Sequence, residues 1–221
     1  MMKILVASDI HGSVEAVEKI RSGSREWKVE LVVICGDITH FGNANQAQML
    51  LRGLSTPGVP VLFIPGNCDS PDLATLQDLG EIHNLHERTR VIEGICFGGV
   101  GGAPPTPFDT PFELSEERIR ESLDLISPGL TTCPRSVLVT HSPPVDTSLD
   151  LTRFRLHAGS RSVRGFIEER QPALVLCGHV HESKGKDTLG RSLMVNPGSV
   201  RNGPYAVVNF AEETEVVFAD S

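Results

Sequence analysis

The stretch LVVICGD (residues 31–37) decides the fold, because a short apolar run ends there on a glycine and an acidic residue. Similar β-rich apolar runs recur at residues 4–7, 61–64, 136–139 and 173–176. Most of them are separated by stretches long enough for a helix. This rhythm predicts an α/β fold.

Helices are expected at residues 14–23, capped by Ser13, and at residues 45–54, 115–126 and 161–170. Past His181 the pattern changes to short runs divided by turn signals, at residues 184–188, 192–195, 205–210 and 215–218. These runs predict antiparallel strands. The stretch 98–111 (GGVGGAPPTPFDTP) is too rich in Gly and Pro for regular structure, so we expect a long loop. It is either a lid over a site or a surface connection.

Length and composition limit the architecture. With 221 residues, 39% of them hydrophobic, the chain can bury one substantial core, so we expect a single domain over residues 1–221. The longest apolar runs fall far short of the roughly 20 residues of a membrane helix, and no secretion signal is visible. Five cysteines occur singly, without a C-x-x-C pair. We therefore expect reduced thiols in a cytoplasmic protein.

The formal net charge of −8 opposes loose, sequence-independent binding to a polyanion. It favours a compact substrate over long nucleic acid, although a local basic or metal-lined cleft could override the total charge.

Five motifs carry side chains suited to metal binding. They are Asp9-Ile10-His11, Gly36-Asp37, Gly66-Asn67-Cys68-Asp69, His141, and Gly178-His179-Val180-His181. Each follows a strand-like run, and in an open α/β sheet ligands collect outside the carboxyl ends of the strands. Side chains two apart in an extended segment point to the same side, so the first and last motifs can each present two ligands. We expect one shared site.

Carboxylate, imidazole and amide oxygen are ligands expected for Mn, Fe, Zn or Ni. Asp37 could bridge two ions, and two ions about 3.5–4 Å apart can clamp a phosphoryl group and lower the pKa of a bound water. Each motif alone has a plainer explanation: Asn67 could sit in a turn, Asp69 could cap a helix starting at Pro71, and His141 could be structural. The order of all five together favours the metal site.

At these residues the sequence closely resembles the calcineurin-like metallophosphoesterase superfamily, whose pattern is D-x-H, G-D, G-N-H-[DE], H and G-H-x-H. The segment Asn196-Pro197-Gly198-Ser199 is similar to one in the smaller bacterial and archaeal members. The resemblance covers nearly the whole chain. It implies a four-layer α/β/β/α sandwich, in which two mixed sheets pack face to face between helices.

The resemblance also implies a ligand set. One metal would be held by Asp9, His11, Asp37 and His181, and the other by Asp37, Asn67, His141 and His179. Two divalent ions are expected, with manganese first and Fe, Ni, Zn or Mg as alternatives. A hydroxide between them would attack phosphorus, and Asp37, Asn67, Cys68 and His141 are the expected catalytic residues.

Cys68 departs from the superfamily pattern, because many members have histidine after the asparagine. A thiol there could donate a proton, or it could ionise beside two cations and become a ligand or an inhibitor-sensitive site. Small prokaryotic members with the same Gly-Asn-Cys-Asp resemble phosphodiesterases. We expect a diesterase, since an acidic leaving group needs less help from a general acid.

Two histidines are candidate substrate contacts. His40 stands where many relatives have an acidic residue. It either contacts the substrate or lies on an ordinary surface loop, and we give the two interpretations equal weight. His157 lies in the basic segment 153–164, whose arginines could bind phosphate oxygens. The favoured alternative is that Ser160 caps a helix whose arginines are solvated or paired with acidic residues. In that case His157 is the one residue of the segment expected to contact the substrate.

The predicted function is hydrolysis of small phosphodiesters, nucleotides among them, with two divalent metals. The alternatives are a non-catalytic protein-binding scaffold of the same fold, a nuclease acting on long DNA or RNA, and a phosphomonoesterase. The ligand positions are all retained, which counts against the scaffold, whereas Cys68 gives it some weight. Monomer and homodimer both stay open.

Overall fold

Continuous apolar runs form strands that are buried on both faces. In β2 (Leu31–Ile34), Val32 packs into a core beneath helices, while Val33 packs into a core between two sheets. Neighbouring side chains point to opposite faces of a strand, so a run without polar residues requires cover on both sides. The apolar runs recognised in the sequence therefore mark central strands.

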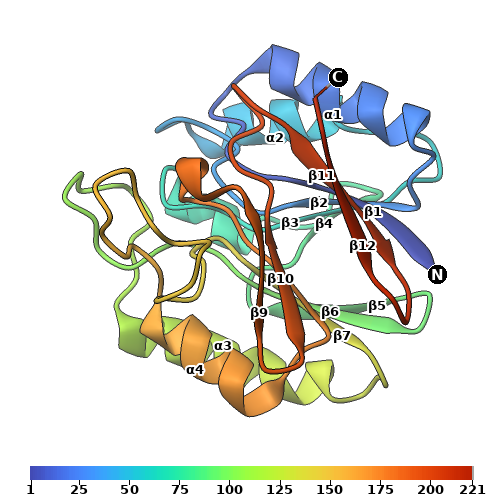
Figure 1. Cartoon of the computed structure of the whole chain (residues 1–221). Helices are drawn as coiled ribbons and strands as arrows, with labels where there is room; N and C mark the ends of the chain where they lie inside the picture. The colour runs from blue at the N-terminus through green and yellow to red at the C-terminus, as the bar shows by residue number, and fades with distance from the viewer. Residues whose placement is uncertain (221) are drawn as a thin grey trace.

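The computed structural model describes residues 1–220 and shows two six-stranded sheets packed between pairs of helices (Figure 1). The helices α1 (Val14–Glu26) and α2 (Ala44–Gly53) cover one sheet, and α3 (Glu116–Leu130) and α4 (Arg161–Arg170) cover the other. Three hydrophobic cores separate these four layers. The predicted α/β/β/α sandwich of mixed sheets is confirmed.

The first sheet has the order β12-β11-β1-β2-β3-β4. Its strands β1 (Met2–Ala7), β2, β3 (Val61–Phe63) and β4 (Ile82–Asn84) are parallel, and β11 (Tyr205–Phe210) and β12 (Glu215–Ala219) add an antiparallel edge. The second has the order β5-β6-β7-β8-β10-β9. Here β6 (Ile95–Val100), β7 (Ser136–Thr140), β8 (Leu174–Leu176) and β10 (Ser192–Asn196) are parallel, between antiparallel β5 (Arg88–Ile92) and β9 (Gly185–Leu189).

Two expectations about strands were wrong. The C-terminal segment is not wholly antiparallel, because β10 pairs with β8 in parallel. The predicted loop 98–111 begins late, since Gly98 and Gly99 belong to β6. A Cβ atom at Gly99 would lie 2.7 Å from Ile64 Cγ2, so glycine is required where β6 packs closely against its neighbours. The strands β4, β5 and β6 were not predicted from the sequence.

Polar side chains begin the helices as expected, with one exception. Ser13 and Ser160 each accept a hydrogen bond from a first-turn backbone N–H, and so cap α1 and α4. Asp69 does not cap the helix that begins at Pro71. Ser70 caps that short 3₁₀ helix (Pro71–Thr75), while Asp69 is fully buried beside the candidate site.

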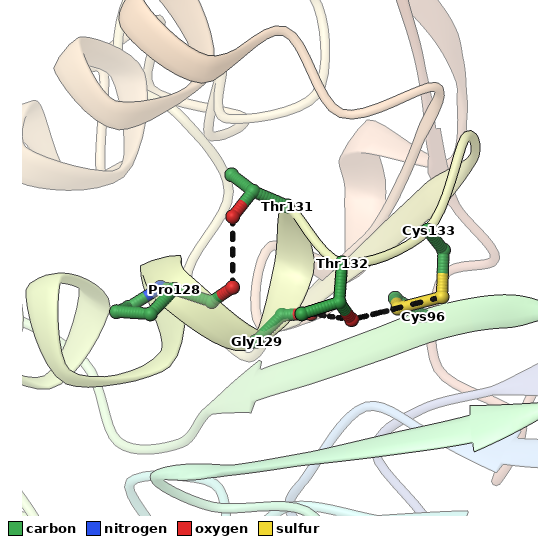
Figure 2. The surroundings of a disulfide bond; sticks show 6 residues. All are labelled: Cys96, Pro128, Gly129, Thr131, Thr132 and Cys133. Atoms are coloured by element: carbon green, nitrogen blue, oxygen red, sulfur yellow. Dashed lines mark hydrogen bonds between the residues drawn. A yellow bond between two sulfur atoms is a disulfide. The ribbon is translucent and has the colours of Figure 1, made fainter.

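A disulfide joins Cys96 on β6 to Cys133, just after α3 (Figure 2). The expectation of reduced thiols is wrong for this pair and holds for Cys35, Cys68 and Cys177, which are free and buried. The two bonded cysteines are 37 residues apart in sequence, and they meet because α3 packs against β6. Their spacing alone carried no signal of this pairing.

Among residues 1–220, no helix combines the length and apolar character needed to cross a membrane.

The buried imidazole of His86 predicts an acid-sensitive fold. Its Nδ1 accepts a hydrogen bond of 2.9 Å from the Gly101 N–H, and burial lowers the pKa of His86 to about 4. Below pH 6.5 His86 is protonated in the unfolded chain but stays neutral in the folded protein down to about pH 4. The free energy of unfolding therefore falls between pH 6.5 and 4, by about 3 kcal/mol in total.

The variant His86→Asn keeps an acceptor for Gly101 and cannot titrate. Urea unfolding at pH 7 and pH 4.5 should show a smaller loss of stability for this variant than for the wild type. An equal loss in both proteins would show that His86 does not titrate in this way.

Candidate metal centre

The five motifs lie after the carboxyl ends of parallel strands in both sheets. Asp9 follows β1, Asp37 follows β2 and Asn67 follows β3 in the first sheet, while His141 follows β7 and His179 follows β8 in the second. The sheets pack face to face, so these turns meet at one end of the sandwich. The structure brings together all seven predicted metal ligands.

One cluster of donor atoms forms around Asp9. His181 Nε2 lies 3.0 Å from Asp9 Oδ1, and His11 Nε2 lies 3.2 Å from His181 Nε2. The ligand atoms of these three residues all lie within 4.8 Å of one another. Two imidazole nitrogens and a carboxylate oxygen therefore converge on one point.

A second cluster forms around His141. Its Nε2 lies 2.9 Å from Asn67 Oδ1 and 3.5 Å from Asp37 Oδ1. The ring of His179 lies beside it, with 5.1 Å between the ring centroids. Asp37 faces both clusters, because its other oxygen, Oδ2, lies 3.7 Å from His11 Nε2.

The ligand turns are not extended, contrary to the expectation from residue spacing. Asp9, His11, Asp37 and His179 all have left-handed backbone conformations, with φ of 60°, 47°, 51° and 69°. The Gly-His-x-His pair therefore divides between the clusters, His179 beside His141 and His181 beside Asp9. Left-handed backbone is costly for residues other than glycine and gathers at functional sites.

Asp69 ties two ligand turns together. Its carboxylate accepts hydrogen bonds from the backbone N–H groups of Ile38, Thr39 and Gly66 and from the Thr39 hydroxyl, at 2.7–3.0 Å. These bonds join the turn carrying Asp37 to the turn carrying Asn67. The sequence pattern contains Asp69, but its positioning role was not predicted.

Asn196 holds the turn carrying the last two histidines. Its amide NH₂ donates to the Val180 carbonyl at 3.0 Å, and its oxygen accepts from the Gly198 N–H at 2.9 Å. The hydroxyl of Ser199 donates to the Asp9 carbonyl at 2.9 Å. The Asn-Pro-Gly-Ser segment thus braces both ends of the first cluster.

Thr110 orients the amide of Asn67. The Asn67 NH₂ donates to Thr110 Oγ1 at 3.0 Å, and the Thr110 hydroxyl donates to Glu113 Oε1 at 2.7 Å. With its nitrogen held there, Asn67 turns its oxygen toward His141. Thr110 lies in the segment expected to be a long loop, either a lid over a site or a surface connection, and only the fold shows that it reaches Asn67.

His141 is oriented in the same manner. Its Nδ1–H donates to the Cys35 carbonyl at 2.7 Å, which leaves Nε2 to act as an acceptor or ligand. Metal-binding histidines in proteins commonly have the second ring nitrogen held by such a partner.

Burial sets the protonation of the ligands. It lowers the pKa of His11 to about 4 and that of His179 to about 3, so both imidazoles are neutral near pH 7. Burial, with the nearby charges of Asp9 and Asp69, raises the pKa of Asp37 to about 7. Neutral imidazoles beside crowded carboxylates are complementary to a cation.

This donor set fits divalent metal ions. Nitrogen lone pairs and carboxylate oxygens face one another at close range, and within residues 1–220 the buried His11 Nδ1 has no hydrogen-bond partner. Asp9, His11 and His181 would hold one ion, Asn67, His141 and His179 the other, and Asp37 faces both.

His40 and Cys68 lie beside this centre. Both line the pocket of about 580 Å³ that is also lined by five of the seven predicted ligands, and the ring centroid of His40 lies 5.4 Å from that of His11. Burial and the carboxylate of Asp37 raise the pKa of the Cys68 thiol, so it is protonated.

His157 lies apart from the centre. Its Nδ1 lies 2.7 Å from Asp150 Oδ1, and it is absent from the described residues that line the pocket. Ser160 caps α4, and Arg164 forms an ion pair with Glu168. Both observations agree with the favoured alternative for the basic segment 153–164.

The fold and the donor set define an α/β/β/α protein with a candidate centre for divalent metal ions. The chain belongs to the calcineurin-like phosphoesterase family, whose model matches residues 2–183. Members of this family are hydrolases that bind divalent metals, so the chain is placed in that class.

Three known proteins show the relationship. The uncharacterized protein MJ1162 of Methanocaldococcus jannaschii is 36% identical over 203 residues, 89% of this chain and 88% of the relative. Phosphodiesterase YfcE of Escherichia coli K12 is 33% identical over 76 residues, 32% of this chain and 41% of that protein. The crystal structure of TT1561 of Thermus thermophilus shares the fold, with a TM-score of 0.77, 22% identity and 98% of both chains covered.

Proposed function

We propose that the chain hydrolyses small phosphodiesters with two divalent metal ions, manganese first among them. The observation that carries this is the position of Asp37, whose two oxygens face one donor cluster each. When bound, the two ions would polarise the phosphoryl oxygens and lower the pKa of a water molecule, giving a nucleophile near neutral pH.

The chain's own residues position the reacting groups. Asp69 and Thr110 hold the turn of Asp37 and the amide of Asn67 in fixed orientations, so little reorganisation is needed when substrate arrives. The open pocket above them admits a small ester. The net charge of −8 supports a compact substrate over long nucleic acid. The proposal includes a cytoplasmic protein, as a monomer or homodimer; the three free cysteines support this location, whereas the Cys96–Cys133 disulfide counts against it.

The preference for diesters rests on Cys68. Its thiol has a raised pKa and lies where many relatives have histidine, so a strong general acid for a poor leaving group is missing there. The similarity of 32% of this chain to phosphodiesterase YfcE supports this preference.

The test is hydrolysis of bis(4-nitrophenyl) phosphate and 4-nitrophenyl phosphate by metal-stripped protein, before and after addition of Mn, Ni, Zn or Mg. We expect metal to restore turnover, with the diester cleaved faster. Binding of two ions without turnover of either ester would favour the non-catalytic scaffold.

Replacing Cys68 with histidine should raise the rate on the monoester relative to the diester by about 10-fold or more, because a general acid contributes about 10²–10⁴-fold where it is needed. Cys68→Ser serves as the control, since it changes the thiol without supplying an imidazole. An unchanged rate ratio in Cys68→His would show that the missing acid does not set the preference.

A further inference from the structure

Two aromatic side chains stand exposed on the wall of the metal-centre pocket. Phe41 is 55% exposed and Phe108 is 79% exposed, and both line the pocket that holds the ligand histidines. The two come from different segments, one after β2 and one after β6. Large aromatic surfaces left open inside a site are typical of ligand contacts.

Phe41 is held in place at a conformational cost. Its φ is 59°, a left-handed conformation that a bulky residue rarely adopts, and its N–H donates to the Cys68 carbonyl at 3.0 Å. Its ring stacks on His40, with centroids 4.6 Å apart and planes inclined by 22°. Since His40 in turn contacts His11, an aromatic row runs from a metal ligand to the rim.

Phe108 is carried by a loop that is anchored to the metal centre. Glu113 Oε1 accepts hydrogen bonds from the backbone N–H and the hydroxyl of both Thr106 and Thr110, at 2.7–3.0 Å. Phe108 lies between these two threonines, and its own N–H donates to Thr106 Oγ1 at 3.2 Å. The loop is thus anchored on both sides of Phe108, whose exposed ring lines the same pocket as Asn67.

Arg201 adds a cation to the same pocket. It is exposed, and among residues 1–220 no carboxylate forms an ion pair with it. An unpaired guanidinium beside the candidate metal centre suits a phosphate oxygen.

We propose that Phe41 and Phe108 form a stacking subsite for the base of a nucleoside phosphate, whose phosphate group binds at the metal centre beside Arg201. This inference rests on the proposed function, and it narrows the substrate class to nucleotide-type diesters. A base presents a flat π face, which stacks on aromatic side chains with little regard to its identity.

The experiment is calorimetric titration of manganese-loaded protein with adenosine 5′-monophosphate and, separately, ribose 5-phosphate. The two ligands share the sugar phosphate and differ in the base. We expect the nucleotide to bind at least about 10-fold more tightly than the sugar phosphate, the range of base–aromatic stacking.

The variants Phe41→Gly and Phe108→Ala should each lose about 5- to 10-fold in affinity for the nucleotide and keep the affinity for ribose 5-phosphate. Phe154→Ala is the matched control, because Phe154 is 75% exposed and is not among the described residues of this pocket. Phe41→Gly also relieves the left-handed backbone, so thermal stability should not fall.

Equal binding of the two ligands by the wild type, or nucleotide affinity unchanged in the Phe41→Gly, Phe108→Ala double variant, would overturn the subsite. The readout is binding and not hydrolysis, so absence of hydrolysis would count against the proposed function and leave this result readable.

Discussion

Replacing Asp37 with alanine is expected to abolish metal uptake and to lower the rate of diester hydrolysis by at least about 1000-fold. The reason is that the two oxygens of Asp37 face one cluster each, with Oδ1 3.5 Å from His141 Nε2 and Oδ2 3.7 Å from His11 Nε2. Its loss removes a donor from each. Metal content by mass spectrometry and initial rates with added manganese measure the effect.

The variant Asp37→Asn separates charge from shape. An asparagine can still accept the hydrogen bond that Cys68 N–H donates to Asp37 Oδ1 at 2.8 Å. It also removes a buried charge that lies near Asp9 and Asp69, so the metal-free variant should unfold no more easily than the wild type. Wild-type activity in either variant would show that Asp37 does not link the two ions.

Gly66→Ala should have the second largest effect, although glycine contributes no ligand. A Cβ atom there would lie 2.1 Å from Asp37 Oδ1 and 2.2 Å from the Asp37 backbone nitrogen. The turns of Asp37 and Asn67 would have to move apart. We expect about 100-fold lower turnover and a loss of about 1–3 kcal/mol in stability.

Gly165→Ala is the matched control for that change. Gly165 lies within α4, and nothing lies within 4 Å of the added Cβ atom, so this substitution should leave activity unchanged and slightly stabilise the helix. Rates and denaturant midpoints of the two variants give the comparison. If Gly66→Ala bound metal as tightly as the wild type, the close approach of the two turns would be unimportant.

The sequence predicted most of the central strands, and the strand ends where the candidate ligands gather, because both are local signals. An apolar run such as residues 31–34 has to be covered on both faces, and a polar residue just after it, such as Asp37, falls at the strand end. The helix at residues 161–170 was predicted within its observed bounds, since Ser160 supplies an ordinary cap.

Features that depend on contacts between distant segments were not predicted. Glycines replace the usual apolar pattern in β6, because Gly98 and Gly99 make room for Leu130 and Ile64. The partnership of Thr110 with Asn67 spans 43 residues. Neither residue type nor spacing distinguishes such a threonine from an ordinary loop residue.

The backbone of the ligand turns was mispredicted for a different reason. Alternation of side chains in extended chain placed Asp9 and His11 on one side, whereas both are left-handed. Hydrogen bonds from their backbone N–H groups to the carbonyls of Gly36 and Asp37, at 3.0 and 2.8 Å, hold this conformation. Asp9 and His11 therefore lie together at the site, as expected, but on a turn and not on an extended segment.

The most direct test of a two-metal hydrolase is titration of metal-stripped protein with manganese while turnover of bis(4-nitrophenyl) phosphate is followed. We predict negligible turnover without metal and a rise that levels off at two equivalents per chain. Full turnover in the stripped protein, or no turnover after two ions have bound, would contradict this account.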